Sequence, residues 1–280
     1  MAALTWAGFT LDRPRVMGIL NVTPDSFSDG DADRSAARAI EAGCALAAAG
    51  ADIIDIGGES TRPGADPVDP AEEIRRVLPV VRALAGRGLR ISIDTRNAAT
   101  MEAALDAGAA IVNDVSALAH DPEAARLLAA RRVPVVLMHM RGTPASMSRH
   151  AVYADVAAEV TAELTARMET ALAAGIAREA ICLDPGVGFA KHAEHSIALL
   201  RGLPALARLG RPLLVGLSRK GVIGQLTGVA APRARLGGSL AAGLYAVSRG
   251  ATILRVHDVA QTVQALRVWQ ALAGPCGAPR

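Results

Sequence analysis

The chain has 280 residues, of which 51% are hydrophobic and only 2% aromatic, and its formal net charge is +3. This length suits one large domain whose core is built from Ala, Val, Leu and Ile. The basic residues form no stripe with interleaved aromatic residues, so we expect no nucleic-acid binding. No apolar run reaches the length of a membrane span and the N-terminus lacks a signal-peptide pattern, so we expect no membrane association and a cytoplasmic location.

The predicted elements follow one another in a regular order. Residues 1–15 predict a short N-terminal extension whose apolar segment 4–10 forms a small hairpin over one end of the core. Apolar, β-compatible segments predict eight strands, at residues 16–20, 52–56, 90–93, 110–112, 134–138, 180–183, 213–217 and 253–256. Helical periodicity predicts eight helices, at residues 35–49, 70–85, 98–107, 122–130, 152–174, 194–209, 231–249 and 259–273. Asp69 and Asp121 are the expected N-caps of the second and fourth helices, and Pro204 is a potential break in the sixth.

This alternation of strands and helices predicts the fold class. Eight βα units in a single domain, residues 1–280, favour an α/β fold of the closed (β/α)8 or TIM-barrel type. An open, doubly wound parallel sheet is the alternative, because its strands are also short and apolar. The glycine fingerprint of a dinucleotide site is incomplete, since residues 186–191 read GVGFAK and lack the third glycine.

The three cysteines, Cys44, Cys182 and Cys276, show no metal-type spacing, and their odd number argues against a disulfide framework. Cys44 falls in an Ala-rich predicted helix and Cys182 in a predicted strand. We therefore expect both to be reduced thiols of the core.

The segment 17–30, MGILNVTPDSFSDG, joins a buried strand to a turn-rich polar loop. Asn21 ends the apolar run, and the loop carries Phe27, one of few aromatic residues in the chain. α/β proteins place their chemistry where a buried strand opens onto such a loop. Taken alone, the segment fits an ordinary βα connection capped by Asp and Ser equally well.

Polar side chains follow the C-terminal ends of all eight predicted strands. They are Asn21, Glu59 to Arg62, Asp94, Asn113, His139, Asp184, Lys220, and Arg255 with His257. In a barrel the eight ends meet at one mouth, where barrel enzymes bind their substrates. Helix caps explain some of the Asp and Asn residues but not a lysine, two arginines and two histidines. The mouth is therefore the candidate active site.

The residue types at this mouth fall into two groups. The first offers carboxylates, an amide and an ammonium that suit a flat, nitrogen-rich heterocycle: Asp94, Asn113, Asp184 and Lys220. The second consists mostly of cationic donors that suit an anion such as phosphate: Asn21, Thr61, Arg62, Arg255 and His257. Arg255 and His257 are two apart on an extended segment, so we expect their side chains to point the same way.

Only two of the thirty basic residues are lysines, Lys191 and Lys220. A chain so biased toward arginine keeps lysine where a compact ammonium is needed, which favours a functional role for Lys220. For Lys191, chance explains the choice of lysine equally well.

Two other patterns carry less weight. Residues 216–220, GLSRK, are not a nucleophile elbow, because Lys220 replaces the second glycine. His192 and His195 are three apart on a predicted helix and have a spacing that suits a metal, but a solvated helix face explains them better.

Eight segments at or near the predicted strand ends resemble the motifs of dihydropteroate synthases, in the order found in that family. They are residues 17–30, 57–64, 92–95, 112–116, 138–143, 183–191, 216–220 and 255–259. The resemblance implies a (β/α)8 barrel, usually a homodimer, that acts in folate biosynthesis. Such an enzyme is a transferase that joins 4-aminobenzoate to 6-hydroxymethyl-7,8-dihydropterin diphosphate and releases diphosphate and 7,8-dihydropteroate.

The resemblance also implies residue roles in pterin binding. The pterin would be held by Asp94, Asn113, Asp184 and Lys220, in a pocket lined by Met138 and Phe189. Asp184 would accept hydrogen bonds from the amino group of the ring and the adjacent N–H. Arg255 would lie against the pterin face and reach the diphosphate. Lys220, Asp94 and Arg255 would be the catalytic residues.

Further roles concern the diphosphate and the aminobenzoate. The diphosphate site would be completed by Asn21, Thr61, Arg62 and His257, with Asn21 also a ligand of the cofactor Mg²⁺. Loops at residues 23–34 and 62–67 would close over the site, and Phe27 and Pro63 would line the aminobenzoate pocket. Gly221, where the family often has Ser, would bind the aminobenzoate carboxylate through its backbone N–H. The loop sequence DGD at residues 29–31 also departs from the family, where a second glycine is common.

Two other functions fit parts of the sequence. A pterin-binding methyltransferase shares the barrel and the pterin carboxylates, but would need neither Arg62 and His257 nor the loop at residues 23–34. A paralogue without activity would keep the fold and lose the site, whereas all the matched site residues are present. Dihydropteroate synthesis is therefore the function that the sequence favours.

Overall fold

Eight parallel strands form the central sheet of the protein, whose computed structural model describes residues 4–23, 32–60 and 67–273. The strands are β3 Arg15–Asn21, β4 Ile53–Gly57, β5 Ile91–Asp94, β6 Ile111–Asp114, β7 Val135–Met138, β8 Ile181–Asp184, β9 Leu214–Gly216 and β10 Ile253–Val256. They are hydrogen-bonded in the order β8-β7-β6-β5-β4-β3-β10-β9, and one bridge, between Leu183 and Leu213, joins the two ends of that order. This cyclic order confirms the barrel and shows that the open, doubly wound alternative is wrong.

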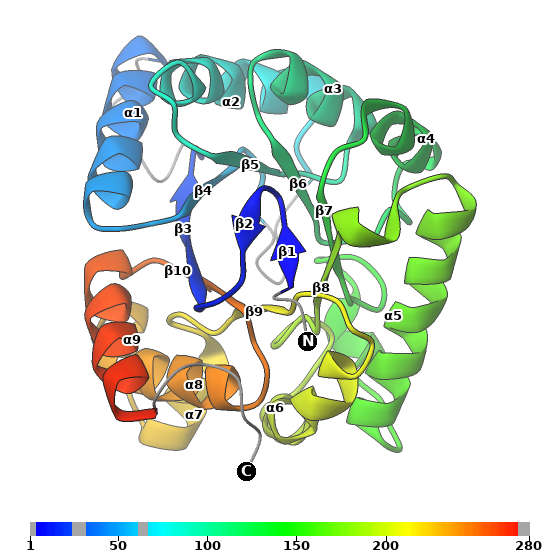
Figure 1. Ribbon diagram of the computed structural model, residues 1–280, viewed down its shortest axis with the longest axis vertical. Coiled ribbons are helices and arrows are strands. Elements are labelled where there is room, and N and C mark those ends of the chain that lie inside the picture. Colours follow the sequence, from blue (N-terminus) through cyan, green and yellow to red (C-terminus); the bar gives the residue numbers. More distant parts are fainter. Residues whose placement is uncertain (1–3, 24–31, 61–66, 274–280) are drawn as a thin grey trace.

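Helices surround the ring of strands (Figure 1). They are α1 Ala32–Ala48, α2 Pro70–Ala85, α3 Ala98–Asp106, α4 Pro122–Arg131, α5 Val156–Ala173, α6 Ala193–Ala207, α7 Gly221–Thr227, α8 Leu236–Ser248 and α9 Val259–Ala273. Short 3₁₀ helices lie at Met147–His150, Arg178–Ala180 and Pro232–Ala234. Among these described elements, no helix combines the length and apolar character that crossing a membrane requires.

Two predicted N-caps fix the starts of their helices. The Asp69 carboxylate accepts a hydrogen bond from the backbone N–H of Ala71 at 2.9 Å, and Asp121 accepts one from Glu123 at 3.0 Å. Each bond satisfies an N–H that the first helical turn leaves without a partner. The predicted starts of α2 and α4 are thereby confirmed.

Three predicted helix starts are wrong by three residues or more: α1 begins at Ala32 instead of residue 35, and two other helices begin later than predicted. The helix expected from residue 152 begins at Val156, because the Asp155 carboxylate caps it by accepting from the N–H groups of Ala157 and Ala158, both at 3.0 Å. The helix expected from residue 231 begins at Leu236, because Pro232–Ala234 forms a separate 3₁₀ turn first.

The potential break at Pro204 is not a break. Helix α6 continues through Pro204 to Ala207. A proline ring removes one backbone donor and clashes with the carbonyl one turn earlier. Pro204 lies in the last turn, so the strain falls close to the point where the helix ends in any case.

The N-terminal hairpin closes one end of the barrel. It consists of β1 Thr5–Trp6 and β2 Phe9–Thr10 and lies across the centre of the strand ring (Figure 1). Its Trp6 side chain is 2% exposed, and the indole N–H donates to the carbonyl of Ala180 at 2.8 Å. Next to it, inside the barrel and toward the C-terminal ends of the strands, lies an inner apolar cluster: Met17, Ile53, Ile111, Val136, Cys182, Leu214 and Ile253. The predicted cover is confirmed.

The described cysteines are free thiols, as predicted. Cys182 is fully buried in β8, and burial raises the pKa of its thiol far above the usual range. Cys44 is only half-buried, in α1, where it packs against the core from the side. Cys276 lies outside the described residues.

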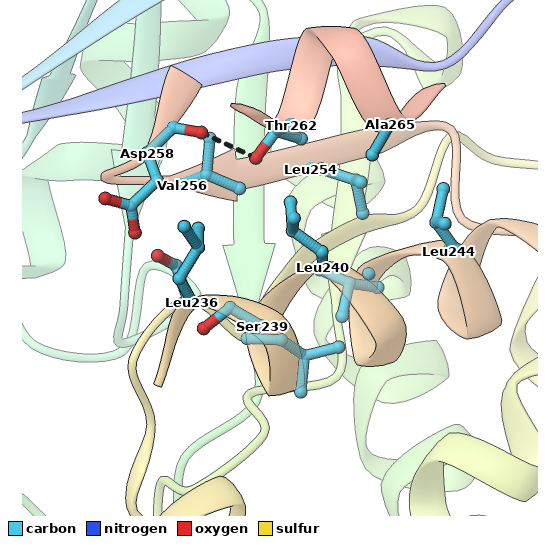
Figure 2. Close-up of a pocket in the computed structure, with 13 residues that line it drawn as sticks. Leu236, Ser239, Leu240, Leu244, Leu254, Val256, Asp258, Thr262 and Ala265 are labelled. Carbon is cyan, nitrogen blue, oxygen red and sulfur yellow. Dashed lines mark hydrogen bonds between the residues drawn. The ribbon is translucent and has the colours of Figure 1, made fainter. Parts of the chain in front are cut away.

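The helical layer packs tightly where α8 meets the barrel. Leu236, Leu240 and Leu244 of α8 point toward β10 and the start of α9 (Figure 2). The cavity left between these elements has a volume of only about 10 Å³. A cavity of this size holds one water at most, so this contact belongs to the packing of the fold.

We expect Trp6→Ala to lower the free energy of unfolding by about 3–5 kcal/mol, because the change removes a large aromatic side chain and leaves a cavity over the inner apolar cluster. Trp6→Phe keeps most of the ring and loses the bond to Ala180, so its expected cost is about 1 kcal/mol. Urea unfolding measures both values. Equal stability of Trp6→Ala and the parent protein would show that the hairpin does not close the barrel.

Candidate active site

A layer of polar side chains lies directly above the inner apolar cluster. Side chains alternate between the two faces of a strand, so the residue two positions after an interior residue also faces the interior. Ile53, Ile111, Val136, Cys182 and Ile253 of the cluster are followed in this way by Asp55, Asn113, Met138, Asp184 and Arg255. The sequence therefore builds a barrel with an apolar floor and a polar mouth.

The register of the strands brings several predicted residues level with one another. Gly57 of β4 pairs with Asn21 of β3 on one side and with Asp94 of β5 on the other. Asp94 in turn pairs with Asn113 of β6. Four adjacent strands thus present their C-terminal ends at the same height, as expected for a barrel mouth.

Arg255 joins two buried carboxylates across this mouth. Its Nε donates to Asp55 Oδ2 and its Nη2 donates to Asp94 Oδ2, each at 2.6 Å. Asn113 Nδ2 donates to the same Asp55 oxygen at 3.0 Å. Asp55 is fully buried, and its other oxygen has no hydrogen-bond partner among the described residues. The four side chains form one network, which we call the arginine network.

Asp55 is absent from the residues predicted for the site, because it lies inside β4 rather than at its end. A signal for it does exist in the sequence. It is a carboxylate between Ile54 and Ile56 in an otherwise apolar strand, two positions after the interior residue Ile53. A buried carboxylate is tolerated only where a partner is available, so this position implies a cation such as Arg255.

Burial sets the charges of the arginine network. It raises the pKa of Asp94 to about 7, against the pull of the Arg255 cation and with a further rise from the Asp55 carboxylate. Burial also disfavours the charged form of Arg255, but Asp55 and Asp94 outweigh it and raise the pKa of the guanidinium. Arg255 therefore stays charged, whereas Asp94 titrates near neutral pH.

A second pair of opposite charges lies beside the loop after β8. Asp184 Oδ1 accepts from the N–H of Gly186 at 2.7 Å. Lys220 Nζ donates to the carbonyl of Val187 and lies 4.4 Å from the ring centre of Phe189. Burial raises the pKa of Asp184, and Lys220 opposes the shift. Burial lowers the pKa of Lys220 to about 8, and Asp184 opposes that shift.

Other predicted residues also lie at the ends of the barrel strands. His257 follows β10, and its backbone N and Nδ1 lie 3.2 and 3.1 Å from the hydroxyl oxygen of Ser218. Met138 ends β7 and is buried. Gly221 is the first residue of α7 and is exposed, with open space around it.

Two residues that follow strand ends are engaged elsewhere. Glu59 binds the Arg96 guanidinium, at 3.0 and 3.2 Å, and accepts from the N–H of Val68 at 3.0 Å. His139 is buried between Lys191 and Glu163. Both side chains hold neighbouring segments in place, so neither is free to bind a ligand.

Some of the predicted site lies outside the described residues. Phe27, Thr61, Arg62 and Pro63 fall there, with most of the two predicted loops at residues 23–34 and 62–67. One boundary is corrected, because α1 already begins at Ala32, inside the first of these predicted loops.

The part of the chain that the structure describes holds no cluster of three or more His, Cys, Asp or Glu side chains suited to a metal ion. His192 and His195 lie at the start of α6, where the backbone N–H of His192 donates to His195 Nδ1 at 3.3 Å. His192 is exposed, as expected for a solvated helix face, whereas His195 is half-buried and its ring centre lies 5.1 Å from that of Tyr153.

Comparison with known proteins agrees with this site. A family model described as pterin binding enzyme matches residues 17–257, which include every strand-end residue from Asn21 to His257. Dihydropteroate synthase of Neisseria meningitidis serogroup B is 52% identical over 268 residues, 94% of each chain. The solved Xanthomonas albilineans dihydropteroate synthase with 4-aminobenzoic acid has a TM-score of 0.91 and 50% identity over 99% of each chain. A structure of that enzyme in complex with 7,8-dihydropteroate has a TM-score of 0.86 and 49% identity over 97% of each chain. The chain therefore belongs to the dihydropteroate synthase family of pterin-binding enzymes.

Proposed function

We propose that the polar mouth of this barrel joins 4-aminobenzoate to 6-hydroxymethyl-7,8-dihydropterin diphosphate. As a member of its family, the protein is a transferase of folate biosynthesis. The observation that carries the assignment of the site is the polar layer above the inner apolar cluster. It gathers the acceptors Asp94 and Asp184, the amide of Asn113 and the ammonium of Lys220 at one end of the barrel.

These groups complement a pterin ring in both charge and hydrogen bonding. A carboxylate accepts two adjacent N–H donors, which suits Asp184 facing the amino group and N–H of the ring. Asn113 offers an acceptor and a donor, and Lys220 offers donors to ring oxygen and nitrogen atoms. Buried Met138 would line the same pocket with half-buried Phe189. The solved relative with 7,8-dihydropteroate supports a pterin site in this fold.

The proposed reaction transfers the pterinylmethyl group from oxygen to nitrogen. The bond between the methylene carbon and the diphosphate oxygen breaks, and the dihydropterin ring delocalises the positive charge that develops. The amine of aminobenzoate is already neutral, so it needs no general base to attack. It forms the new C–N bond and then releases one proton. Arg255 and His257 are proposed to stabilise the diphosphate as it leaves, and Asn21, Thr61 and Arg62 are proposed to complete that site.

Magnesium is proposed as the cofactor, with Asn21 as its protein ligand. Asn21 ends β3 and offers one amide oxygen. Mg²⁺ often takes only one or two protein oxygens and fills its shell with water and substrate phosphates, so a single amide fits this mode. Bound Mg²⁺ would neutralise negative charge on the diphosphate.

Aminobenzoate is proposed to bind between the pterin site and the start of α7. The N–H of Gly221 lies in the first turn of this helix and has no intrahelical partner, so it can donate to a carboxylate. Phe27 and Pro63 are proposed to cover the ring. The solved relative with 4-aminobenzoic acid supports such a site.

We also propose that the protein is a homodimer that uses the outer face of α8. This helix has no charged residue along its 13 positions. Its exposed residues Gly237, Ala241 and Tyr245 recur every four positions and so form one stripe. Four of the five large apolar side chains exposed in the described part of the chain belong to α7, α8 and α9. A second copy with the same uncharged face is the partner that this stripe suits.

The location is proposed to be the cytoplasm. The described cysteines, Cys44 and Cys182, are free thiols, which suits a reducing compartment.

The test of the proposed reaction is incubation of the pure protein with the pterin diphosphate, aminobenzoate and Mg²⁺. We expect dihydropteroate and diphosphate in equal amounts, and no product when Mg²⁺ is replaced by a chelator. Chromatography with a phosphate assay after pyrophosphatase treatment measures both products. Lack of product with all three components present would favour the paralogue without activity.

We expect Asp94→Asn to weaken binding and to stabilise the protein at alkaline pH. A donor amide replaces an acceptor, so the affinity for a pterin without diphosphate should fall by about tenfold or more, as for a lost charged hydrogen bond. The pKa of Asp94 in the folded protein, about 7, lies above its value in the unfolded chain. The stability it contributes is therefore complete below about pH 4 and lost as the pH rises through 7.

The variant cannot ionise at this position, so it should escape that loss. Between pH 5 and pH 8, urea unfolding should show the free energy of unfolding of the variant rising relative to that of the parent protein by about 2–3 kcal/mol, because the parent alone loses this stability as Asp94 ionises. A lower stability of Asp94→Asn at pH 8 would mean that the ion pair with Arg255 outweighs the cost of burying the carboxylate.

We expect Tyr245→Glu to convert the dimer to a monomer, because it replaces the largest side chain of the uncharged stripe with a charge. Val152→Glu is the matched control, since Val152 is 75% exposed but lies away from α8, before α5. Sedimentation velocity at several concentrations measures both variants. A monomeric parent protein, or equal dissociation of both variants, would exclude this face as the interface.

A further inference from the structure

Lys191 is a buried lysine outside the predicted set of ligand-binding residues. It follows the loop after β8 and is only 8% exposed. Its Nζ lies 2.8 Å from His139 Nδ1, 3.1 Å from the carbonyl oxygen of Gly186 and 2.9 Å from that of Phe189. An ammonium has three N–H donors, and all three have a partner here.

Two of these partners belong to a tight loop, residues 186–190. Gly186 and Gly188 have φ values of +65° and +80°, and Ala190 has +48°. A side chain at Gly186 would meet the carbonyl oxygen of His139 at 1.9 Å, so only glycine fits there. Within the loop the carbonyl of Gly186 accepts from the N–H of Phe189 at 3.0 Å; Lys191 adds a second donor to that carbonyl and also donates to the carbonyl of Phe189.

The same loop contacts the proposed pterin-binding groups with its other atoms. The N–H of Gly186 donates to Asp184, the carbonyl of Val187 accepts from Lys220, and the ring of Phe189 lies beside the Lys220 ammonium. The position of the loop therefore sets the positions of both charged side chains. Lys191 holds the same loop through the carbonyls of Gly186 and Phe189.

The third bond ties the loop to a neighbouring strand and helix. His139 accepts from Lys191 at Nδ1, so its Nε2–H donates to Glu163 of α5, at 2.9 Å. Its backbone N–H donates to the carbonyl of Asp184 at 2.9 Å. Arg141 fixes Glu163 in turn, with its Nε 3.0 Å from the carboxylate. This support connects the loop with β7, β8 and α5.

The charge state of His139 agrees with this arrangement. Burial, together with the Lys191 cation, lowers the pKa of His139 to about 4, although Glu163 acts in the opposite direction. The imidazole is therefore neutral at physiological pH and free to accept from Lys191. Burial lowers the pKa of Lys191 to about 7, against the pull of Asp184, so below that pH the ammonium donates to the neutral imidazole.

We propose that Lys191 is a positioning residue for pterin binding: it holds the loop at residues 186–190 so that Asp184 and Lys220 meet the pterin ring. The inference deepens the proposed function of the same site and rests on it. It also gives a reason for the lysine at position 191, which the sequence alone explains equally well by chance.

The test compares Lys191→Met with a matched control, Arg211→Met. Arg211 is a buried cation, 9% exposed, that donates to the carbonyls of Ile181 and Glu179 at the opposite end of β8. Both variants remove a buried cation and its bonds to carbonyl groups. Only Lys191→Met removes the support of the loop beside the site.

We expect calorimetry with a pterin lacking diphosphate to give an affinity about tenfold to a hundredfold lower for Lys191→Met, as for a misplacement of about 1 Å at a binding group. Arg211→Met should bind the pterin as the parent protein does, although it loses stability. Lys191→Gln keeps two N–H donors without the charge and should recover part of the affinity. Unchanged pterin affinity in Lys191→Met, or equal losses in the Lys191→Met and Arg211→Met variants, would overturn the proposal.

A spectroscopic measurement tests the same point without catalysis. Lys191 and Lys220 are the only lysines in the chain, so Lys191→Met or Lys191→Gln leaves Lys220 as the single ¹³C-lysine signal in NMR. We expect the chemical shift of this signal to change, because Lys220 loses its fixed contacts with Val187 and the ring of Phe189. Arg211→Met should leave it unchanged, and an unchanged Lys220 signal in both Lys191 variants would contradict the proposal.

These outcomes separate the inference from the proposed function. A parent protein that binds pterin and forms no product would contradict only the proposed reaction. A parent protein that forms product while Lys191→Met binds pterin normally would contradict only the role of Lys191.

Discussion

The site depends on one guanidinium held between two buried carboxylates. Arg255 bonds Asp55 and Asp94 at 2.6 Å each, and these residues come from β10, β4 and β5. Charges this deep are tolerated only when they are paired, so the three strands must meet in one register. The apolar cluster next to Trp6 supports that register from the closed end of the barrel, since Asp55 and Arg255 follow its residues Ile53 and Ile253 by two positions. The floor of the barrel therefore determines the geometry of its mouth.

The sequence predicts the fold because strand and helix patterns agree with each other along the whole chain. Helices α2 and α9 have the predicted bounds, and the capping carboxylates Asp69 and Asp121 act as expected. The errors occur where a local interaction outweighs helix propensity. Asp155 starts α5 later than the Ala-rich pattern predicts, and Pro232 separates a 3₁₀ turn from α8. The starts of these helices depend on single side chains. A periodic pattern, which is read over many residues, does not detect their effect.

The sequence predicts the strand-end residues of the site but not the side chains that fix them. Asp94, Asn113, Asp184 and Lys220 meet at the mouth because parallel strands end together. Asp55 requires knowing which face of β4 is inside, and the role of Lys191 requires the path of the loop at residues 186–190. Both depend on contacts between residues far apart in the chain, which are set only when the barrel closes.

The electrostatics of the mouth favour a ligand rich in N–H donors. Burial raises the pKa values of Asp94 and Asp184, although Arg255 donates to the first and the N–H of Gly186 to the second. A ligand that adds further donors stabilises the ionised forms and lowers these pKa values. Binding would then release a proton from Asp94 near neutral pH, and part of the free energy lost by burying the carboxylates would be recovered as affinity. Burying these carboxylates destabilises the protein without a ligand. The site would therefore favour a heterocycle that completes their hydrogen bonds.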